Sequence, residues 1–410
     1  MPKDLVSEIA IPPTDRDAVP SPARPDAIAT AVASGGPSRC NLAFEHWSSI
    51  GRQPAATALI GILDGEGIGP ELMAVCRLIL NRVGACTGQR FVFETGGSIG
   101  TPAFQASGQW VTAEIEQFIE AIHARGGALL CGPGGGRFVY ELRRRLNLFC
   151  KLVPLRPTDA LRDFGPLRSE AVRGVDILVV RENLGGLYQG SGDDQAEAGL
   201  RRTRHCFEYN AEQVARIIEV GANLAELRRG RLCVVHKPGG VPGVSALWQD
   251  ITAEVCADRS LDLSLLEVDN ACYQMIADAR AFDVVVASNM FGDVLADGAS
   301  VLLGSRGLSF SANFSDDGIG VYQTGHGAAH DLTGTDRANP IGQVLSMIFM
   351  LREHFDLDQI ADGIERGVEA VLTAGWRTAD IMAPGCRVVG TREMGERIAD
   401  AACLHLHGDA

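Results

Sequence analysis

Two aspartates four residues apart are the first candidates for chemistry. Asp293 and Asp297 stand in the segment NMFGDVLAD, where this spacing places both carboxylates on one face of a helix. Two like charges so close repel each other unless they share a cation. Asp269, which ends the run LSLLEVD, would add a third hard oxygen ligand, and such a set suits Mg²⁺ or Mn²⁺. The alternative is a solvated helix face with ordinary acids, which the apolar neighbours Phe291 and Val294 make less favourable.

Lysine is rare in this chain and therefore informative. Lys and Arg total 37, but only three of these residues are lysine. Lys237 ends the segment RLCVVHK, and Lys151 follows the segment LNLFC. Because arginine supplies positive charge everywhere else, a retained lysine suggests a task that guanidinium cannot perform, such as giving up its proton.

Arginines in two segments could bind an acidic substrate. In the run ELRRRLNL, at least one of Arg143, Arg144 and Arg145 must point toward the apolar side of a short helix. Arg181 ends the apolar run DILVVR. Guanidinium groups bind carboxylates in bidentate fashion, so these side chains could hold an acid. The alternatives are a solvated basic face for Arg144 and Arg145, and a structural ion pair of Arg181 with Glu182 or another acid.

Two glycine-rich segments could approach a cofactor. Residues 64–69, DGEGIG, lie between an apolar run and a helical pattern, but the spacing G-x-G-x-G followed by Pro70 differs from the dinucleotide fingerprint. A tight strand-to-helix turn is the favoured interpretation there. Residues 325–331, GHGAAHD, combine small residues that admit a planar ligand with Asp331, whose carboxylate could accept hydrogen bonds from ribose hydroxyls.

An α/β scaffold would bring these residues together. From Thr57 onward, short apolar runs alternate with longer amphipathic ones, which predicts an α/β fold with buried, largely parallel strands. Predicted strands end at Arg181, Lys237, Asn289 and Asp269. Because sites in open α/β sheets form outside the carboxyl ends of strands, we expect these side chains to converge on one crevice.

Composition excludes several classes of function. The longest largely apolar run, residues 344–351, is far shorter than the roughly 20 residues that span a bilayer. The net charge of −14 disfavours binding to nucleic acid. Residues 1–53 are rich in proline without apolar periodicity, which predicts a disordered extension. They contain neither the apolar region of a signal peptide nor the acid-poor composition of a mitochondrial presequence, so we expect a cytoplasmic protein.

Taken together and in this order, the segments resemble the isocitrate/isopropylmalate dehydrogenase family of β-decarboxylating dehydrogenases. The likeness runs from about residue 57 to about residue 350, through ILDGEGIGPEL, LRRRLNLF, VVRENLGGLYQG, VVHK, VDNACYQM, NMFGDVLAD, GLSFSAN and GHGAAHDLTGTDRANP. It implies an isopropylmalate-dehydrogenase-like two-domain fold that is not a Rossmann fold. The large cofactor-binding domain would be discontinuous, with residues 54–148 plus 304–410, and residues 149–303 would form a small domain with the dimer interface.

The resemblance also implies roles in substrate binding and proton transfer. Arg143 and Arg181 match arginines that bind the malate part of the substrate. Tyr188 matches the tyrosine that acts as an acid toward the enolate carbon. Lys237 matches the lysine that acts as base for the substrate hydroxyl. Because that lysine must be neutral to act, we expect the nearby divalent cation and Arg181 to lower its pKa.

The implied metal and cofactor sites complete the comparison. The implied metal ligands are Asp269, Asp293 and Asp297. Lys237 and Asp269 would reach in from the second subunit of a homodimer. The implied adenosine-binding residues are His326, Gly327, Asp331 and Asn339. An acid at position 331 resembles the members that prefer NAD, since NADP-preferring members carry a lysine there.

The chain departs from the family pattern where the substrate is held. The family reads L-F/Y-A-N-L-R-P where this chain reads LFCKLVP, so Val153 replaces a clamp arginine. Lys151, at an even offset along an extended segment, is an easier replacement than Arg156, which would face the other way. Gln323 stands where many members have a glutamate near the nicotinamide. Arg137 could contact a distal carboxylate as in isocitrate, whereas isopropylmalate would need an aliphatic pocket; the two remain open.

The predicted activity is the NAD-dependent, divalent-metal-dependent oxidative decarboxylation of a malate-type 2-hydroxy acid, similar to 3-isopropylmalate or isocitrate, or a modified relative of these. The alternative is a non-catalytic regulatory subunit of a heteromeric isocitrate dehydrogenase-like complex. Such subunits typically lose catalytic Tyr, Lys or Asp residues, whereas this chain keeps all of them.

Overall fold

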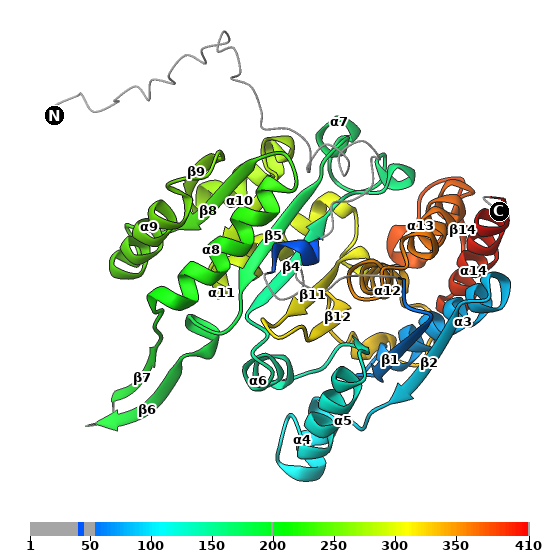
Figure 1. The fold of residues 1–410 in the computed structure, drawn as a ribbon, viewed down its shortest axis with the longest axis horizontal. Coiled ribbons are helices and arrows are strands. Elements are labelled where there is room, and N and C mark those ends of the chain that lie inside the picture. Colours follow the sequence, from blue (N-terminus) through cyan, green and yellow to red (C-terminus); the bar gives the residue numbers. More distant parts are fainter. Residues whose placement is uncertain (1–39, 45–53, 198–199, 409–410) are drawn as a thin grey trace, which may run out of the picture. The chain divides into compact units, whose positions relative to one another are not determined.

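The centre of the fold is one mixed sheet. The computed structural model describes residues 40–44, 54–197 and 200–408, and the architecture below refers to these residues. Their main sheet has ten strands in the order β2-β1-β3-β12-β11-β4-β5-β10-β8-β9 (Figure 1). The strands are β1 (Thr57–Leu63), β2 (Arg90–Thr95), β3 (Ala128–Cys131), β4 (Cys150–Leu155), β5 (Ile177–Glu182), β8 (Arg231–His236), β9 (Asp262–Glu267), β10 (Val284–Ala287), β11 (Phe310–Phe314) and β12 (Gly320–Thr324).

Helices cover this sheet, as the alternating sequence pattern predicts. They are α3 (Gly69–Thr87), α4 (Thr101–Ser107), α5 (Ala113–Ala124), α6 (Phe138–Arg145), α7 (Ser169–Val172), α8 (Ala211–Glu226), α9 (Pro242–Cys256), α10 (Val268–Ala277), α11 (Asn289–Ala299), α12 (Ile341–Glu353), α13 (Asp358–Thr373) and α14 (Thr391–Gly408). The apolar strands β5 and β10 are buried along their whole length, as expected for strands with helices packed on them. Helix α8 packs on β5, β8 and β10, and α12 packs on β11 and β12.

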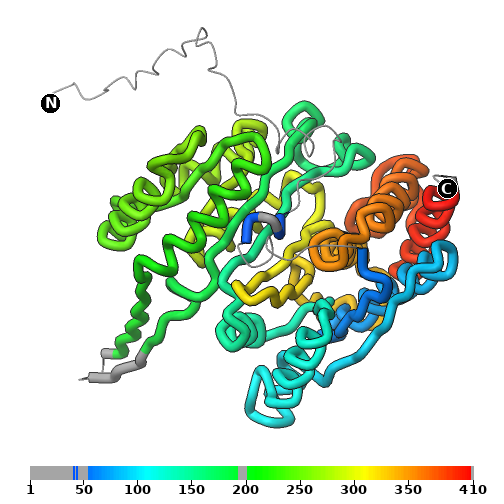
Figure 2. Tube along the Cα trace, viewed as in Figure 1, coloured from blue at the N-terminus to red at the C-terminus, as the bar shows by residue number. Residues whose placement is uncertain are grey.

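Two short strand pairs lie outside the main sheet. Strands β6 (Ser191–Glu197) and β7 (Leu200–Cys206) pair antiparallel in a hairpin that leaves the sheet (Figure 2). Strands β13 (Trp376–Arg377) and β14 (Arg387–Val388) pair near the C-terminal helix α14. None of the described helices combines the length and the apolar composition needed to span a bilayer.

The strand directions test the expected convergence of polar strand ends. Strands β5, β10, β8 and β9 run parallel to one another, so their carboxyl ends share one edge. Arg181 is the second-last residue of β5, Lys237 follows β8, and Asn289 begins α11 just after β10, as predicted. Asp269 differs from the prediction, because β9 ends at Glu267 and the aspartate lies in the first turn of α10. The strand order is mixed and differs from the doubly wound Rossmann order.

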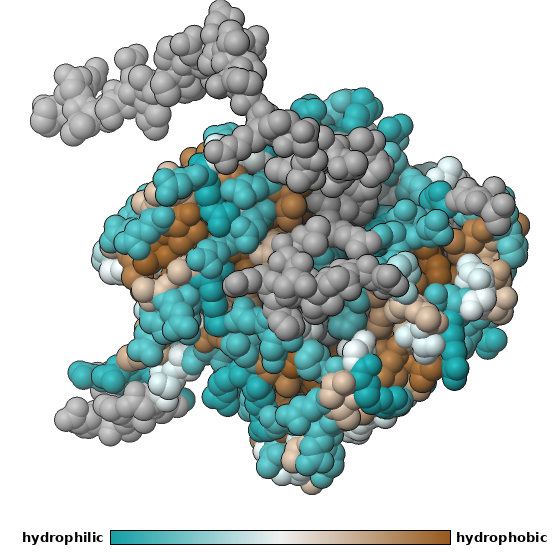
Figure 3. All heavy atoms as spheres, viewed as in Figure 1, coloured by the Kyte–Doolittle hydropathy of each residue, from teal (hydrophilic) through white to brown (hydrophobic). Residues whose placement is uncertain are grey.

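One edge of the main sheet exposes two leucine side chains. Strand β9 is the last strand, and its Leu263 and Leu265 side chains are exposed. Figure 3 shows apolar residues at the surface in the area where Figure 1 draws β8, β9 and α9. Exposed edge strands commonly carry charged residues that discourage pairing with other chains, and here Asp262 and Glu267 stand at the two ends of β9.

A short segment before β1 is ordered, although the sequence predicts disorder for residues 1–53. Residues Cys40–Ala43 form a 3₁₀ helix. The backbone amides of Cys40 and Asn41 donate hydrogen bonds to the buried Glu353 carboxylate, over 3.1 and 2.8 Å. The carbonyl of Ala43 accepts a bond from Asn223 Nδ2, 2.9 Å away. The prediction of disorder is therefore wrong for residues 40–44, and the rest of that extension lies outside the described residues.

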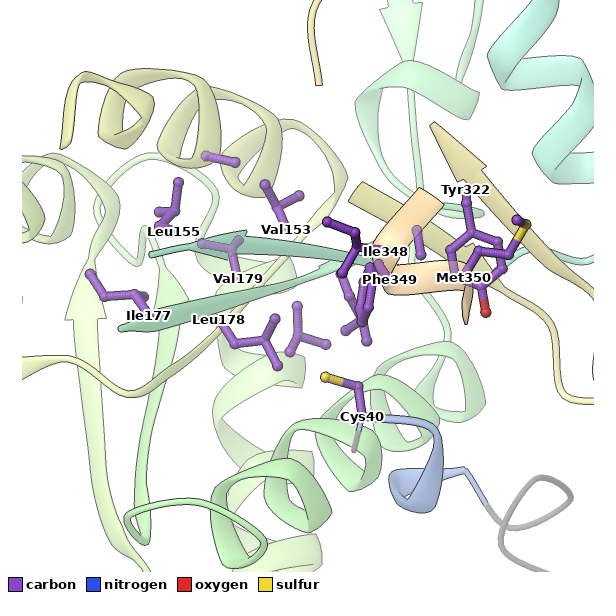
Figure 4. Packing of buried hydrophobic residues seen from close by; sticks show 14 of the residues in the cluster. Cys40, Val153, Leu155, Ile177, Leu178, Val179, Tyr322, Ile348, Phe349 and Met350 are labelled. Atoms are coloured by element: carbon purple, nitrogen blue, oxygen red, sulfur yellow. The ribbon is translucent and has the colours of Figure 1, made fainter. Parts of the chain in front are cut away.

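This segment also adds side chains to the core. Figure 4 shows Cys40 beside the buried side chains of β4 and β5. Phe44 is buried, with its ring centroid 5.1 Å from that of Phe314 and 6.0 Å from that of Phe149. Segment 40–44 therefore contacts both α12, through Glu353, and α8, through Asn223.

Removing the Phe44 ring should destabilise the fold measurably. We expect Phe44→Ala to lower the free energy of unfolding by about 3 kcal/mol, because it empties a buried aromatic site. Leu404→Ala is the matched control, since the Leu404 side chain is 74% exposed and its loss should change stability by less than about 0.5 kcal/mol. Thermal and urea unfolding of the two variants measure the difference. Equal midpoints for the two variants would contradict the packing of Phe44 described here.

Candidate active site

Three cationic side chains from three elements meet at the edge where β5 ends. Strands β4 and β5 pair antiparallel with Lys151 opposite Arg181, so the two side chains share one face of the sheet. Arg143 comes from α6 and lies close enough to act electrostatically on Lys151, as Arg181 also does. All three are nearly buried, with exposed fractions of 5% for Arg143, 8% for Lys151 and 2% for Arg181.

Among the described residues, only Arg181 of these three cations has an acidic partner. Arg181 forms an ion pair with Asp293 and donates from Nη2 to Asn289 Oδ1 over 2.8 Å. Within the part of the chain that the structure describes, the charged ends of Arg143 and Lys151 have no hydrogen-bond or ion-pair partner. Uncompensated buried charge is costly, so the arrangement favours a bound anion. The arginine that sequence reasoning expects on the apolar side of the helix is Arg143.

Burial and mutual repulsion shift the pKa values of this cluster. Desolvation, followed by the charges of Arg143 and Arg181, lowers the pKa of Lys151 to about 7. Desolvation and then the charge of Arg181 lower the pKa of Arg143 to about 9. Of this cluster, Lys151 is therefore the side chain that can lose its proton near neutral pH.

The structure locates Val153, which replaces the clamp arginine, and the basic residues considered for its role. Val153 is packed in the hydrophobic core, as Figure 4 shows. Arg156 pairs with Glu365 and so points to another part of the molecule. Lys151 instead lies between Arg181 of β5 and Asn313 of β11 in the strand register. Arg137, at the start of α6, is exposed and donates from NH2 to the backbone oxygen of Tyr188 over 3.4 Å.

Tyr188 lies beside this cluster in a short 3₁₀ helix, Leu187–Gln189. The Arg181 guanidinium is 5.6 Å from the centroid of its ring, and the Tyr140 ring packs edge-on at 5.6 Å. Desolvation, followed by the negative charge of Asp293, raises the pKa of Tyr188. The phenol therefore keeps its proton at neutral pH, which suits a proton donor.

Lys237 has acidic partners at another place on the same edge. Its ammonium donates to Asp269 Oδ1 over 2.5 Å and to Glu267 Oε2 over 2.6 Å. These hydrogen bonds raise the pKa of Lys237. In one chain the groups beside Lys237 are acids, whereas the expected lowering by a divalent cation and Arg181 concerns the metal-bound homodimer and stays a prediction.

The three predicted metal ligands do not meet within one chain. Asp293 pairs with Arg181, and Asp297 accepts a bond from Arg306 NH2 over 2.8 Å, while Asp269 binds Lys237. Among the described residues, no group of three or more His, Cys, Asp or Glu side chains could hold a metal ion. Asp293 and Asp297 do share one face of α11 and are both partly exposed, so they offer two hard oxygen donors to a cation that finds its other ligands elsewhere.

The two glycine-rich segments pack against each other. The Ile68 amide donates to the Ala328 carbonyl over 2.9 Å. Gly67 has φ of 62°, and a Cβ there would lie 2.0 Å from the Ala328 oxygen. Residues 64–69 therefore form a tight turn, as the sequence predicts, and this turn supports the loop of residues 325–331.

The residues predicted to bind adenosine line this loop and its neighbour. His326 Nδ1 lies 3.0 Å from the Gly327 carbonyl oxygen, whereas its buried Nε2 has no partner among the described residues. Burial lowers the pKa of His326, which favours the neutral imidazole. Asp331 is exposed, and Asn339 is buried with its Nδ2 donating to Asp380 over 3.0 Å. The unpartnered nitrogen beside an exposed glycine fits a planar, polar ligand.

A chain of buried amides connects Arg181, in the cation cluster, with Gln323 of β12. The sequence analysis did not predict it. Asn289 accepts from Arg181 and donates to the Asn183 carbonyl over 2.9 Å. Asn183 donates to Asn313 Oδ1 over 3.1 Å, and Asn313 donates to Gln323 Oε1 over 3.4 Å. Each of these amides interrupts or ends an otherwise apolar run, which is the signal that could have revealed them.

Comparison with known sequences agrees with this geometry. A family model described as isocitrate/isopropylmalate dehydrogenase matches residues 59–398. The 3-isopropylmalate dehydrogenase of Synechocystis sp. is 39% identical over 354 residues, which cover 83% of this chain and 96% of that protein. The 3-isopropylmalate dehydrogenase of Oleidesulfovibrio alaskensis is 37% identical over 355 residues, which cover 83% of this chain and 98% of that protein.

Comparison with solved structures gives the same result for the fold. The crystal structure of isocitrate dehydrogenase from Methylococcus capsulatus superposes with a TM-score of 0.74 at 27% identity. The match covers 84% of this chain and 99% of that one. The predicted α/β fold class, distinct from the Rossmann fold, is confirmed.

Proposed function

The chain belongs to the isocitrate/isopropylmalate dehydrogenase family, and from this premise we propose that it catalyses the NAD-dependent, divalent-metal-dependent oxidative decarboxylation of a malate-type 2-hydroxy acid. The observation that carries the proposal is the buried cluster of Arg143, Lys151 and Arg181 beside Tyr188 and Asp293. Within the described residues, the buried cations Arg143 and Lys151 have no acidic partner, which fits a small anionic substrate, and a protonated phenol beside them fits a proton donor.

The proposal gives the cluster, Lys237 and Tyr188 each a task in this reaction. Arg143, Arg181 and Lys151 bind the carboxylates and thereby orient the carbon that carries the hydroxyl group. Lys237 accepts the proton of that hydroxyl, and the nicotinamide cofactor, when bound, would supply the hydride acceptor. After the β-carboxylate leaves as CO₂, Tyr188 donates its proton to the enolate carbon.

The residues fit a divalent cation and a nicotinamide cofactor. Asp269, Asp293 and Asp297 would hold Mg²⁺ or Mn²⁺, which stabilises negative charge on the substrate oxygens when it is bound. His326, Gly327, Asp331 and Asn339 would bind the adenosine part of NAD. The carboxylate at position 331 disfavours the 2′-phosphate of NADP because like charges repel.

A homodimer would complete this site. In one chain, Lys237 and Asp269 bind each other away from Asp293, so a second copy is proposed to supply them. The proposed interface includes α10 and α11, where Tyr273 is 72% exposed and Val294 is 53% exposed. Large apolar groups exposed beside the proposed metal ligands favour coverage by another protein surface.

The proposed domain division follows the sheet. Strands of residues 54–148 and 304–410 form one half of the strand order, and strands of residues 149–303 form the other. The antiparallel pair of β11 and β4 would join the two domains. The proposed location of the enzyme is the cytoplasm.

A substrate panel tests the proposed function. We expect NADH to form from at least one of malate, 3-isopropylmalate, isocitrate, tartrate and phosphonate-bearing malates in the presence of Mn²⁺. Turnover should stop with EDTA and return with added Mn²⁺, and NADP should support less than about one tenth of the rate with NAD. Ligand binding without turnover of any of these acids would favour the non-catalytic regulatory subunit instead.

A further inference from the structure

The charge balance around Lys151 is uneven in a way that the proposed function alone does not require. Arg143 approaches from α6 and Arg181 from the neighbouring strand β5, and both repel a proton on Lys151. From α11, Asp293 and Asp297 attract it, but Arg181 and Arg306 already bind these two acids. The register neighbour on β11 is Asn313, which does not titrate.

Among the three cations, the lysine is the one that can lose its charge. A guanidinium group stays protonated in proteins, whereas a buried ammonium group sheds its proton readily. Lys151 is also buried without a partner for its ammonium group in the described residues. In the free enzyme the repulsion is therefore relieved at Lys151, and its lowered pKa, about 7, agrees with this.

We propose that Lys151 is a binding residue that takes up a proton as an anionic substrate enters the site. The inference rests on the proposed function, because it requires an acid bound between Arg143 and Arg181. A neutral amine, one solvent proton and the dianionic acid give an ammonium group paired with a carboxylate, so the charge of the pocket is adjusted to its ligand. Substrate affinity should therefore fall as the pH rises, while an arginine at position 151 would hold its charge throughout.

Proton uptake can be measured without turnover. Succinate is a suitable probe because it has two carboxylates and no hydroxyl group to oxidise. Calorimetric titration of the full-length protein with succinate, in two buffers of different ionisation enthalpy with Mg²⁺ present, gives the number of protons bound. At pH 8, where about nine tenths of an amine with a pKa of about 7 is neutral, we expect nearly one proton per succinate.

Variants assign the proton to its residue. In the wild type, the dissociation constant of succinate should rise about fivefold between pH 7 and pH 8. Lys151→Arg should keep the affinity measured at pH 7, with no proton uptake and less than a twofold change between these pH values. Lys151→Met should lose the uptake and bind more weakly at pH 7. Arg144→Gln is the matched control, because Arg144 is the exposed neighbour of Arg143 and should leave the uptake unchanged.

Three results would overturn the inference: no binding of succinate at millimolar concentration, binding without proton uptake, or the same uptake in Lys151→Arg. These outcomes are separate from the fate of the proposed function. A protein that binds succinate with proton uptake but forms no NADH retains the inference and loses the function. A protein that forms NADH but binds succinate without uptake retains the function and loses the inference.

Discussion

Lys237→Arg is expected to lower turnover by about 10² to 10⁴-fold, the usual contribution of a general base. The base must be neutral to accept the hydroxyl proton, and guanidinium does not give up its own proton in proteins. The substitution keeps the positive charge beside Asp269 and Glu267, so the local ion pairs persist. The measurement is kcat with the best acid of the substrate panel, at saturating NAD and Mn²⁺.

A control on the same strand separates chemistry from folding. Arg231 begins β8 and is exposed, whereas Lys237 follows the other end of that strand. Arg231→Lys should keep both turnover and thermal stability. Near-normal turnover in Lys237→Arg would remove the assignment of Lys237 as the base, irrespective of metal and cofactor binding.

Asp293→Asn should weaken metal binding by at least about tenfold and lower turnover at a fixed Mn²⁺ concentration by a similar factor or more. The amide keeps an oxygen for Arg181 but removes the negative charge that a hard cation requires. Added Mn²⁺ should recover part of the lost turnover, because Asp297 remains on the same face of α11. Titration with Mn²⁺, followed by the electron paramagnetic resonance of the free ion, measures the affinity directly.

The control for this variant is Asp250→Asn, which removes an exposed acid from helix α9. It changes the net charge by the same amount, so any general electrostatic effect on Mn²⁺ appears in both proteins. An Mn²⁺ affinity that is equal in the two variants would exclude Asp293 from the metal site. Equal affinity with reduced turnover in Asp293→Asn would point instead to its ion pair with Arg181.

Local patterns in the sequence were sufficient for much of the fold. The apolar runs before Arg181, Lys237 and Asn289 are the parallel strands β5, β8 and β10, because a strand buried on both faces must be apolar throughout. The helical pattern of the run ELRRRL predicted that at least one arginine points inward, and Arg143 is that residue. Such features depend on neighbours along the chain, which a single sequence contains.

Features that depend on distant partners were missed. Segment 40–44 is ordered because Glu353, 313 residues from Cys40, accepts its backbone amides. The pKa of Lys237 is raised because β8 and β9 bring Glu267 and Asp269 beside it. Neither pairing has a periodic signature, so composition alone indicated disorder in the first case, and the ion pair of Lys237 with Glu267 was not predicted in the second.

The amide chain from Asn289 through Asn183 and Asn313 to Gln323 has a consequence for how the two ends of the site communicate. Amides neither gain nor lose protons under physiological conditions, so this buried connection keeps its charge constant while the proposed proton uptake changes the charge of Lys151 at one end. It can hold the proposed acid-binding end and the proposed nicotinamide end in a fixed mutual orientation whatever the pH. A change in pH would then alter the affinity for the acid and leave the orientation of the substrate toward the nicotinamide unchanged.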